Sequence, residues 1–124
     1  MSSQDFVDGL TALGYEPRDL QLEPRVIAFC YTILVGSRAG ESIDLALAVP
    51  GDFPLQCPSG PHVRPHLLPF NGTSDPHPVG GVHAARDGVP AEWQYWSRPY
   101  PEWATSDRSA RAYMGHIHHL FEAL

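Results

Sequence analysis

Residues 26–49, VIAFCYTILVGSRAGESIDLALAV, contain the pattern that decides the fold. The segment 26–35 is rich in β-branched and aromatic residues, which favour β-strands. The segment 42–49 alternates, so that every second residue would lie on the same side of a sheet. These alternating apolar positions are Ile43, Leu45, Leu47 and Val49. With a glycine-flanked turn at 36–40, the two segments predict an antiparallel hairpin with one buried face.

A helix is expected on each side of these strands. Near the N-terminus, Ser3 can cap a helix that Gly14 ends, because its apolar residues recur at helical spacing. These residues are Phe6, Val7, Leu10 and Leu13. The last segment is a clearer amphipathic helix, which Thr105 or Ser106 can cap, with Asp107 in its first turn. Its apolar face consists of Ala110, Tyr113, Met114, Ile117, Leu120, Phe121 and Leu124.

Two more short strands are expected, one at Leu20 and Leu22 and one from Val63 to Leu68, where Pro65 limits pairing. Most of the 13 prolines and 11 glycines fall between Pro50 and Pro101, which predicts a long irregular region with little strand pairing. Scattered aromatic residues would hold this region against the core. They are Phe53, Phe70, Trp93, Tyr95, Trp96 and Tyr100.

These elements predict a single α+β domain over residues 1–124. Its expected order is an N-terminal helix, an antiparallel four-stranded meander, a long aromatic loop region and a C-terminal amphipathic helix. The formal net charge is −6, and all eight basic residues are arginines spread along the chain, which argues against a nucleic-acid groove. No apolar run approaches the ~18 residues of a membrane span, and residues 1–5 lack the basic start of a secretory signal. We therefore expect a cytoplasmic protein with neither nucleic acid nor a membrane as partner.

The two cysteines have no paired spacing, so neither a disulfide nor a zinc site is expected. Cys30 lies within the apolar strand, where a small buried hydrophobic residue is the expected role. Cys57 lies in a loop between Gln56 and Pro58. The seven histidines also lack the spacing of converging metal ligands. We expect no metal and no cofactor.

Three local motifs resemble the ubiquitin-conjugating (UBC) family. Residues 49–58, VPGDFPLQCP, are similar to the segment that ends a strand in that family, with Cys57 in place of a proline. His77-Pro78 resembles the start of the His-Pro-Asn motif, but Val79 stands where asparagine belongs. Residues 93–98, WQYWSR, with Trp103 and Asp107 after them, resemble the signature of the prokaryotic family E of UBC-like proteins.

The resemblance extends over residues 1–124 and implies the UBC-like fold. It also implies a role in a bacterial ubiquitin-like modification pathway. Family E members are associated with ubiquitin-like modifiers, adenylating activating enzymes and JAB-type metallopeptidases. These proteins are therefore the partners that the resemblance implies.

The catalytic residues of that family are missing at the expected places. A conjugating enzyme needs a thiolate nucleophile and a polar group that stabilises the oxyanion. Residues 78–97 contain no cysteine, and the pattern Gly81-Val82-His83-Ala84 places His83 where the thiol would lie. We expect a pseudoenzyme, that is, a non-catalytic scaffold or adaptor for protein–protein interaction. The alternatives are an active enzyme with Cys57 as a displaced nucleophile, or an unrelated small binding domain.

Candidate site residues follow from the same motifs. His83 could act as a general base or an acyl acceptor, although an ordinary hydrogen bond is the favoured explanation for a histidine in a loop. His77, Trp96, Ser97 and Arg98 are the candidate binding residues. Arg98 could hold the carboxylate of a modifier tail with two hydrogen bonds. For the tryptophans, the favoured interpretation is a structural role in clamping the loop against the sheet and the last helix. For Arg98, the alternative is a structural role.

Overall fold

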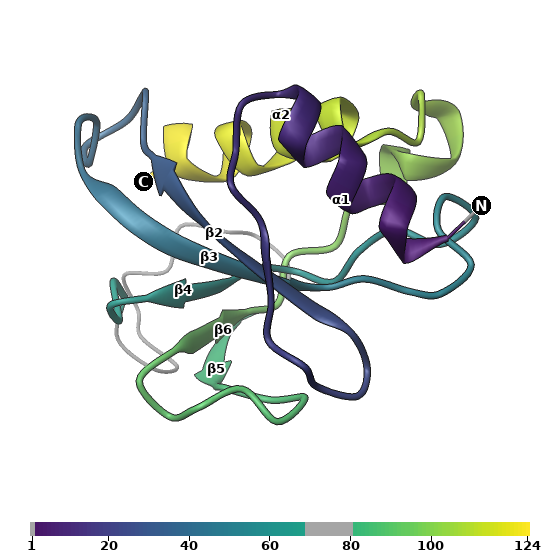
Figure 1. The fold of residues 1–124 in the computed structure, drawn as a ribbon. Coiled ribbons are helices and arrows are strands. Elements are labelled where there is room, and N and C mark those ends of the chain that lie inside the picture. The colour runs from purple at the N-terminus through teal and green to yellow at the C-terminus, as the bar shows by residue number, and fades with distance from the viewer. Residues whose placement is uncertain (1, 69–80) are drawn as a thin grey trace.

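The computed structural model describes residues 2–68 and 81–124, and its elements confirm the α+β class. In chain order they are α1 (Ser3–Ala12), β1 (Arg18–Asp19), β2 (Val26–Thr32), β3 (Ser42–Ala48), β4 (His62–Arg64), β5 (Val82–Ala84), β6 (Gln94–Trp96), the 3₁₀ helix η1 (Pro101–Thr105) and α2 (Ala110–Glu122). Both helices cover the same face of one sheet (Figure 1). Phe70 and His77 lie outside the described residues, as do Pro78 and Val79.

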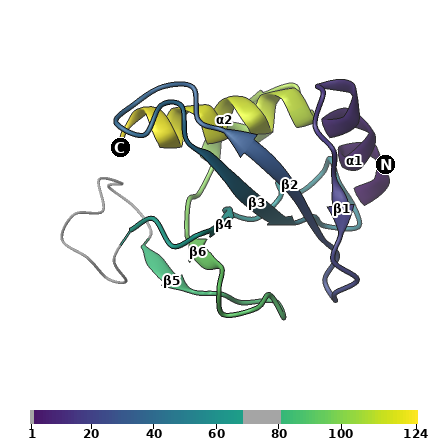
Figure 2. The ribbon, with the colours of Figure 1, turned by 60° about the vertical axis from the view of Figure 1, so that its left-hand side comes forward.

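In the described residues the sheet has six antiparallel strands in the order β1-β2-β3-β4-β6-β5, rather than the four predicted. The first four pair consecutively and form the expected meander. Strands β6 and β5 extend it, so that β1 and β5 form its two edges (Figure 2). Both added strands are only three residues long. Such short strands leave too little alternation to be recognised among prolines and glycines.

Some strand boundaries differ from the predicted ones. The first strand is Arg18–Asp19, and Leu20 and Leu22 follow it. Strand β4 ends before Pro65, which has no N–H to donate to a neighbouring strand.

The helix caps also differ. The N-cap of α1 is Ser2 rather than Ser3, and its N–H donates to the Asp5 carboxylate. The cap of α2 is Ser109, whose Oγ accepts the Ala112 N–H at 3.1 Å. The prediction that Thr105 or Ser106 caps this helix was therefore wrong. Asp107 therefore precedes α2 instead of lying in its first turn. Gly14 does end α1, with a φ of 97° just after the C-cap.

The face of the sheet that α1 and α2 cover, called the inner face, contains the main core. Phe6 of α1 and Phe121 of α2 are fully buried against it. The predicted alternation is confirmed, since every second residue of β3 and the following Val49 joins this core. Its sheet residues include Ile27, Phe29, Tyr31, Ile43, Leu45, Leu47, Val63 and Trp96.

The opposite face, called the outer face, contains a second and smaller core. Its sheet residues are small, namely Val26, Ala28, Ala46 and Ala48. Val89 and Trp93, from the segment before β6, cover these residues. The hairpin therefore buries both of its faces over part of its length, where one buried face was expected.

Cys30 is exposed, which overturns the prediction of a buried thiol. Alternation along β2 places Cys30 on the outer face, together with Val26 and Ala28. Its cross-strand neighbours are Asp44 and then Arg64, which are polar. The second core does not extend as far as Cys30, because the residues that cover it, Val89 and Trp93, lie over the other end of β2. Among the described residues, no helix is long and apolar enough to cross a bilayer.

Candidate functional site

The WQYWSR motif at 93–98 contains β6 and links the two cores. Alternation places Trp96 on the inner face, where it is fully buried and its ring centroid lies 5.3 Å from that of Phe121. Trp93 lies on the outer face and belongs to the second core. Trp103, in η1, donates its indole N–H to the Pro54 carbonyl at 3.0 Å. All three tryptophans therefore hold loops against the sheet or the last helix, as the structural interpretation predicted.

Gln94, between the two tryptophans, is a fully buried polar side chain that sequence reasoning missed. Its Oε1 accepts the indole N–H of Trp96 at 2.9 Å and the backbone N–H groups of Leu67 and Leu68 at 3.2 Å each. Its Nε2 donates to the Leu68 carbonyl. A buried amide must satisfy its polar atoms, so Gln94 fixes the segment that follows β4. The signal in the sequence for this buried role was the position of a glutamine between two aromatic residues.

Arg98 is 5% exposed and is already engaged within the fold. Its Nη1 donates to the carbonyls of Gly81 at 3.3 Å and Ser97 at 3.0 Å. Its guanidinium lies 5.3 Å from the centroid of the Trp96 ring. Ser97 is half-buried, and its N–H donates to the same Gly81 carbonyl at 2.8 Å. Arg98 thus fixes the start of β5 beside β6, while the predicted binding residue His77 lies outside the described residues.

Gly60 allows the segment before β4 to approach this motif closely. A Cβ at position 60 would lie 2.2 Å from the Trp96 carbonyl oxygen and 2.9 Å from the Arg98 backbone nitrogen. We therefore expect Gly60→Ala to lower the free energy of unfolding by about 1–3 kcal/mol, the range for overpacking. Gly51→Ala is the matched control, since a Cβ there meets no atom within 4 Å. Urea denaturation of both variants measures the difference, and equal stabilities would contradict the close approach.

Cys57 is half-buried and packs against the main core. Burial raises the pKa of its thiol to about 12. A thiol is a poor nucleophile unless it is deprotonated, and cysteines that react have lowered pKa values. Cys57 therefore carries a protonated, unactivated thiol at neutral pH.

His83 lies exposed on the edge strand β5. Its ring centroid is 6.2 Å from that of Tyr95, on the outer face. Within residues 2–68 and 81–124 the His83 imidazole has no hydrogen-bond partner. Cys57, by contrast, packs against the core of the inner face, so the structure does not bring the two candidate catalytic residues together.

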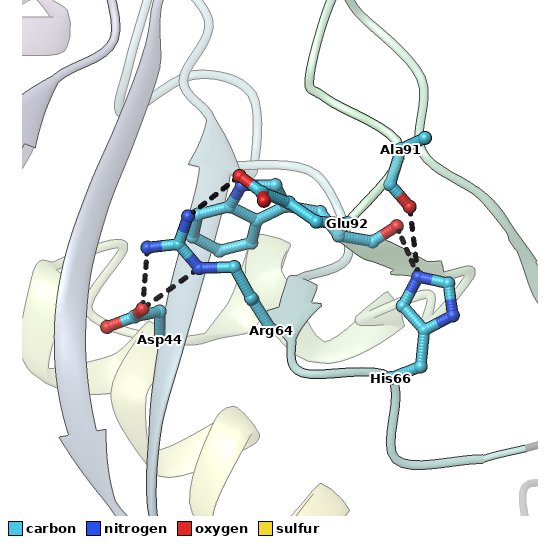
Figure 3. Close-up of polar contacts among 6 residues, drawn as sticks. Asp44, Arg64, His66, Ala91 and Glu92 are labelled. Atoms are coloured by element: carbon cyan, nitrogen blue, oxygen red, sulfur yellow. Dashed lines mark hydrogen bonds and ion pairs between the residues drawn. The ribbon is translucent and has the colours of Figure 1, made fainter.

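A cluster around Arg64, also missed by sequence reasoning, occupies the outer face (Figure 3). The Arg64 guanidinium donates from Nε at 3.1 Å and from Nη2 at 2.7 Å to Oδ2 of Asp44. It donates from Nη1 at 3.0 Å to Oε1 of Glu92 and lies 4.5 Å from the centroid of the Trp93 ring. The Asp44 and Arg64 side chains are cross-strand neighbours, which explains their contact.

His66 connects the same region to the segment before β6. Its Nε2 lies 3.1 Å from the Ala91 carbonyl and 3.0 Å from the Trp93 carbonyl, so this nitrogen carries the proton and donates (Figure 3). Together with Arg64, this histidine fixes the backbone on both sides of Glu92. The side chains of Arg64, in β4, and of His66, just after it, thereby hold Trp93 on the sheet.

The contacts described above hold segments of the fold against one another. Among the described residues, no three His, Cys, Asp or Glu side chains converge as metal ligands. Comparison with known proteins finds no family model that matches the chain, and no curated protein or solved structure that is similar to it.

Proposed function

We propose that this chain is a non-catalytic, UBC-like scaffold or adaptor in a bacterial ubiquitin-like modification pathway. It would act in the cytoplasm and bind the modifier or its adenylating activating enzyme, with a JAB-type metallopeptidase as a further partner. The arrangement of helix, meander, aromatic segment and helix supports this proposal. So does the position of the WQYWSR motif, which forms a strand and connects both cores.

The observation that carries the non-catalytic assignment is the chemistry at Cys57 and His83. The thiol of Cys57 has a pKa raised by burial to about 12, the reverse of what a thioester-forming cysteine needs. His83, which the motif pattern places at the position of the family's thiol, is an exposed imidazole on an edge strand. A pathway member without a nucleophile can still bind and position a partner.

The proposed contact surface lies where β5 meets the end of β6. Ser97 is half-buried and His83 exposed, so both are accessible to a partner. Trp96 and Arg98 are 0% and 5% exposed, so they would support this surface from beneath rather than touch a partner directly. His77 completes the proposed set of binding residues.

The test is an assay with the ubiquitin-like protein and the adenylating enzyme of the same genome. The modifier, the enzyme and ATP are incubated with this chain, and the products are separated on a non-reducing gel. We expect no thiol-sensitive adduct, while isothermal titration with the modifier or with the activating enzyme gives a measurable Kd. Neither Cys57→Ser nor its matched control Cys30→Ser should change that Kd.

Two results would overturn the proposal. An adduct that reductant removes, and that Cys57→Ser abolishes while Cys30→Ser retains, would establish an active enzyme with a displaced nucleophile. Failure of both the modifier and the activating enzyme to bind would favour an unrelated small binding domain. In that case the resemblance would extend to the arrangement of elements alone.

A further inference from the structure

The outer face has a small half-open pocket between two segments that are far apart in the sequence. Arg18 of β1 and the following Leu20 and Leu22 form one side. Pro90 and Glu92, from the segment before β6, form the other side, and Trp93 also lines the pocket. The cavity has a volume of about 240 Å³. No residue of the proposed UBC-like contact surface lines it, so it is independent of the function proposed above.

The interior of this pocket is apolar and held in place. Trp93 is 2% exposed, because the alanines of β2 and β3 leave room for its ring on the sheet. Leu20 and Leu22 pack against the same core and are half-buried. Gly88, with a φ of 81°, brings the opposite wall close to Leu22, since a Cβ there would lie 3.4 Å from its Cδ2. The fold therefore holds the walls of the pocket, which offer aliphatic surface beside the nearly buried indole of Trp93.

The two arginines that line the pocket differ in whether their charges are paired within the fold. Arg64 is bound by both Asp44 and Glu92 and stacks on Trp93, so two carboxylates more than offset its positive charge within the fold (Figure 3). Arg18 lies on the same face, because its cross-strand neighbour is Ala28 of the second core. In the part of the chain that the structure describes, the Arg18 guanidinium has no hydrogen bond or ion pair. One guanidinium at the rim is therefore available to an anion.

The size of the cavity limits the ligand. Sites for drug-sized ligands enclose roughly 300–1,000 Å³, and this pocket is smaller. It fits a single apolar group of about the size of a leucine or phenylalanine side chain. A guanidinium beside such a group favours a carboxylate, which it can hold with two parallel hydrogen bonds.

We propose that the Arg18 pocket binds an apolar group that bears a carboxylate, with the apolar group on Trp93, Leu20 and Leu22 and the carboxylate on Arg18. This chemistry occurs at the C-terminal residue of a polypeptide that ends in a large apolar residue. It also occurs in a free small acid of the same size. Both kinds of ligand would occupy the same site. They differ in that a polypeptide would continue out of the open side of the pocket, whereas a free acid would not.

The test titrates the protein with N-acetyl-L-phenylalanine and, separately, with N-acetyl-L-phenylalaninamide, and follows the Trp93 indole N–H by NMR. We expect both probes to shift this signal, with the acid binding about fivefold more tightly because the rim charge is partly exposed to solvent. Arg18→Gln should weaken binding of the acid to the level of the amide and leave the amide unchanged. Arg111→Gln is the matched control, since Arg111 is exposed on α2, away from the pocket.

Two further probes, N-acetyl-Gly-Gly-Phe and 3-phenylpropionate, distinguish a polypeptide terminus from a free small acid as the ligand. Tighter binding of the peptide supports a chain terminus, and tighter binding of the free acid supports a small metabolite-like acid. The proposal is overturned if neither first probe shifts the Trp93 signal. Equal affinities for acid and amide, or an acid affinity that Arg18→Gln leaves unchanged, would overturn it as well.

Discussion

Trp96→Ala is expected to lower the free energy of unfolding by about 3–5 kcal/mol, the range for removing a large buried aromatic side chain. Trp96 is fully buried, packs on Phe121 of α2 and donates its indole N–H to Gln94. The substitution leaves a cavity between β6 and α2 and removes one of the donors to a buried carbonyl oxygen. Urea denaturation followed by far-UV circular dichroism measures the loss.

Two variants show whether this loss comes from burial. Trp96→Phe keeps an aromatic ring against Phe121 and loses the N–H, so we expect a smaller loss than for alanine. Leu55→Ala removes a large apolar side chain that is 55% exposed, and its stability should change by at most about 0.5 kcal/mol. If Trp96→Ala were as stable as Leu55→Ala, Trp96 would be a contact residue rather than a support for the proposed surface.

The stability of the protein is expected to fall by about 3 kcal/mol between pH 6.5 and pH 4 because of His62 alone. His62 is fully buried on the outer face, and burial lowers its pKa from 6.5 to about 4, although the Asp87 carboxylate partly offsets this effect. Well above pH 6.5 the imidazole is neutral in the folded and the unfolded chain. As the pH falls, the unfolded chain takes up a proton that the folded chain does not, so folding becomes less favourable.

The structure shows what protonation would disturb. His62 Nε2 accepts the Arg86 N–H at 3.1 Å, and its ring centroid lies 5.0 Å from that of Tyr95. A proton on Nε2 would replace this acceptor by a second donor that faces the Arg86 N–H. The segment after β5 would lose that hydrogen bond at low pH.

The measurement is the free energy of unfolding at several pH values for the natural chain and for His62→Gln. Glutamine keeps an acceptor for Arg86 and does not titrate, so the difference between the two proteins should change by about 3 kcal/mol from pH 7 to pH 4. Any constant cost of the substitution cancels in this comparison. His83→Gln is the control, because His83 is exposed beside the same Tyr95. A difference that stays constant with pH for His62→Gln would contradict the assignment.

Long periodic segments were predictable, while short strands and caps were not. The hairpin of β2 and β3 and both helices follow patterns of seven or more residues, and the structure confirms them. Strands β5 and β6 have three residues each, and pairing with neighbours rather than local periodicity stabilises them. The cap of α2 was placed too early because Thr105, Ser106 and Ser109 are similar capping residues, and the sequence does not show that η1 occupies the first of them.

In the candidate site, too, some features were predictable from the sequence and others were not. The sequence pointed to the WQYWSR motif through its resemblance to a family signature, and it predicted a clamping role for the tryptophans. It did not show that Gln94 is a buried acceptor, or that Arg64 and Arg18 belong to the same face. These relations join residues 20 or more positions apart, and only strand pairing brings them together.

By itself the sequence determined the composition of the chain, the two amphipathic helices, the alternation that assigns residues of the hairpin to its two faces, and the absence of a cysteine between residues 78 and 97. The tertiary structure decided which residues of each face are covered. It buried His62, exposed Cys30 and left Arg18 beside an apolar pocket. The physical reason is that local periodicity assigns a side chain to a face, whereas burial, and with it the pKa of His62 and Cys57, depends on what other segment packs there.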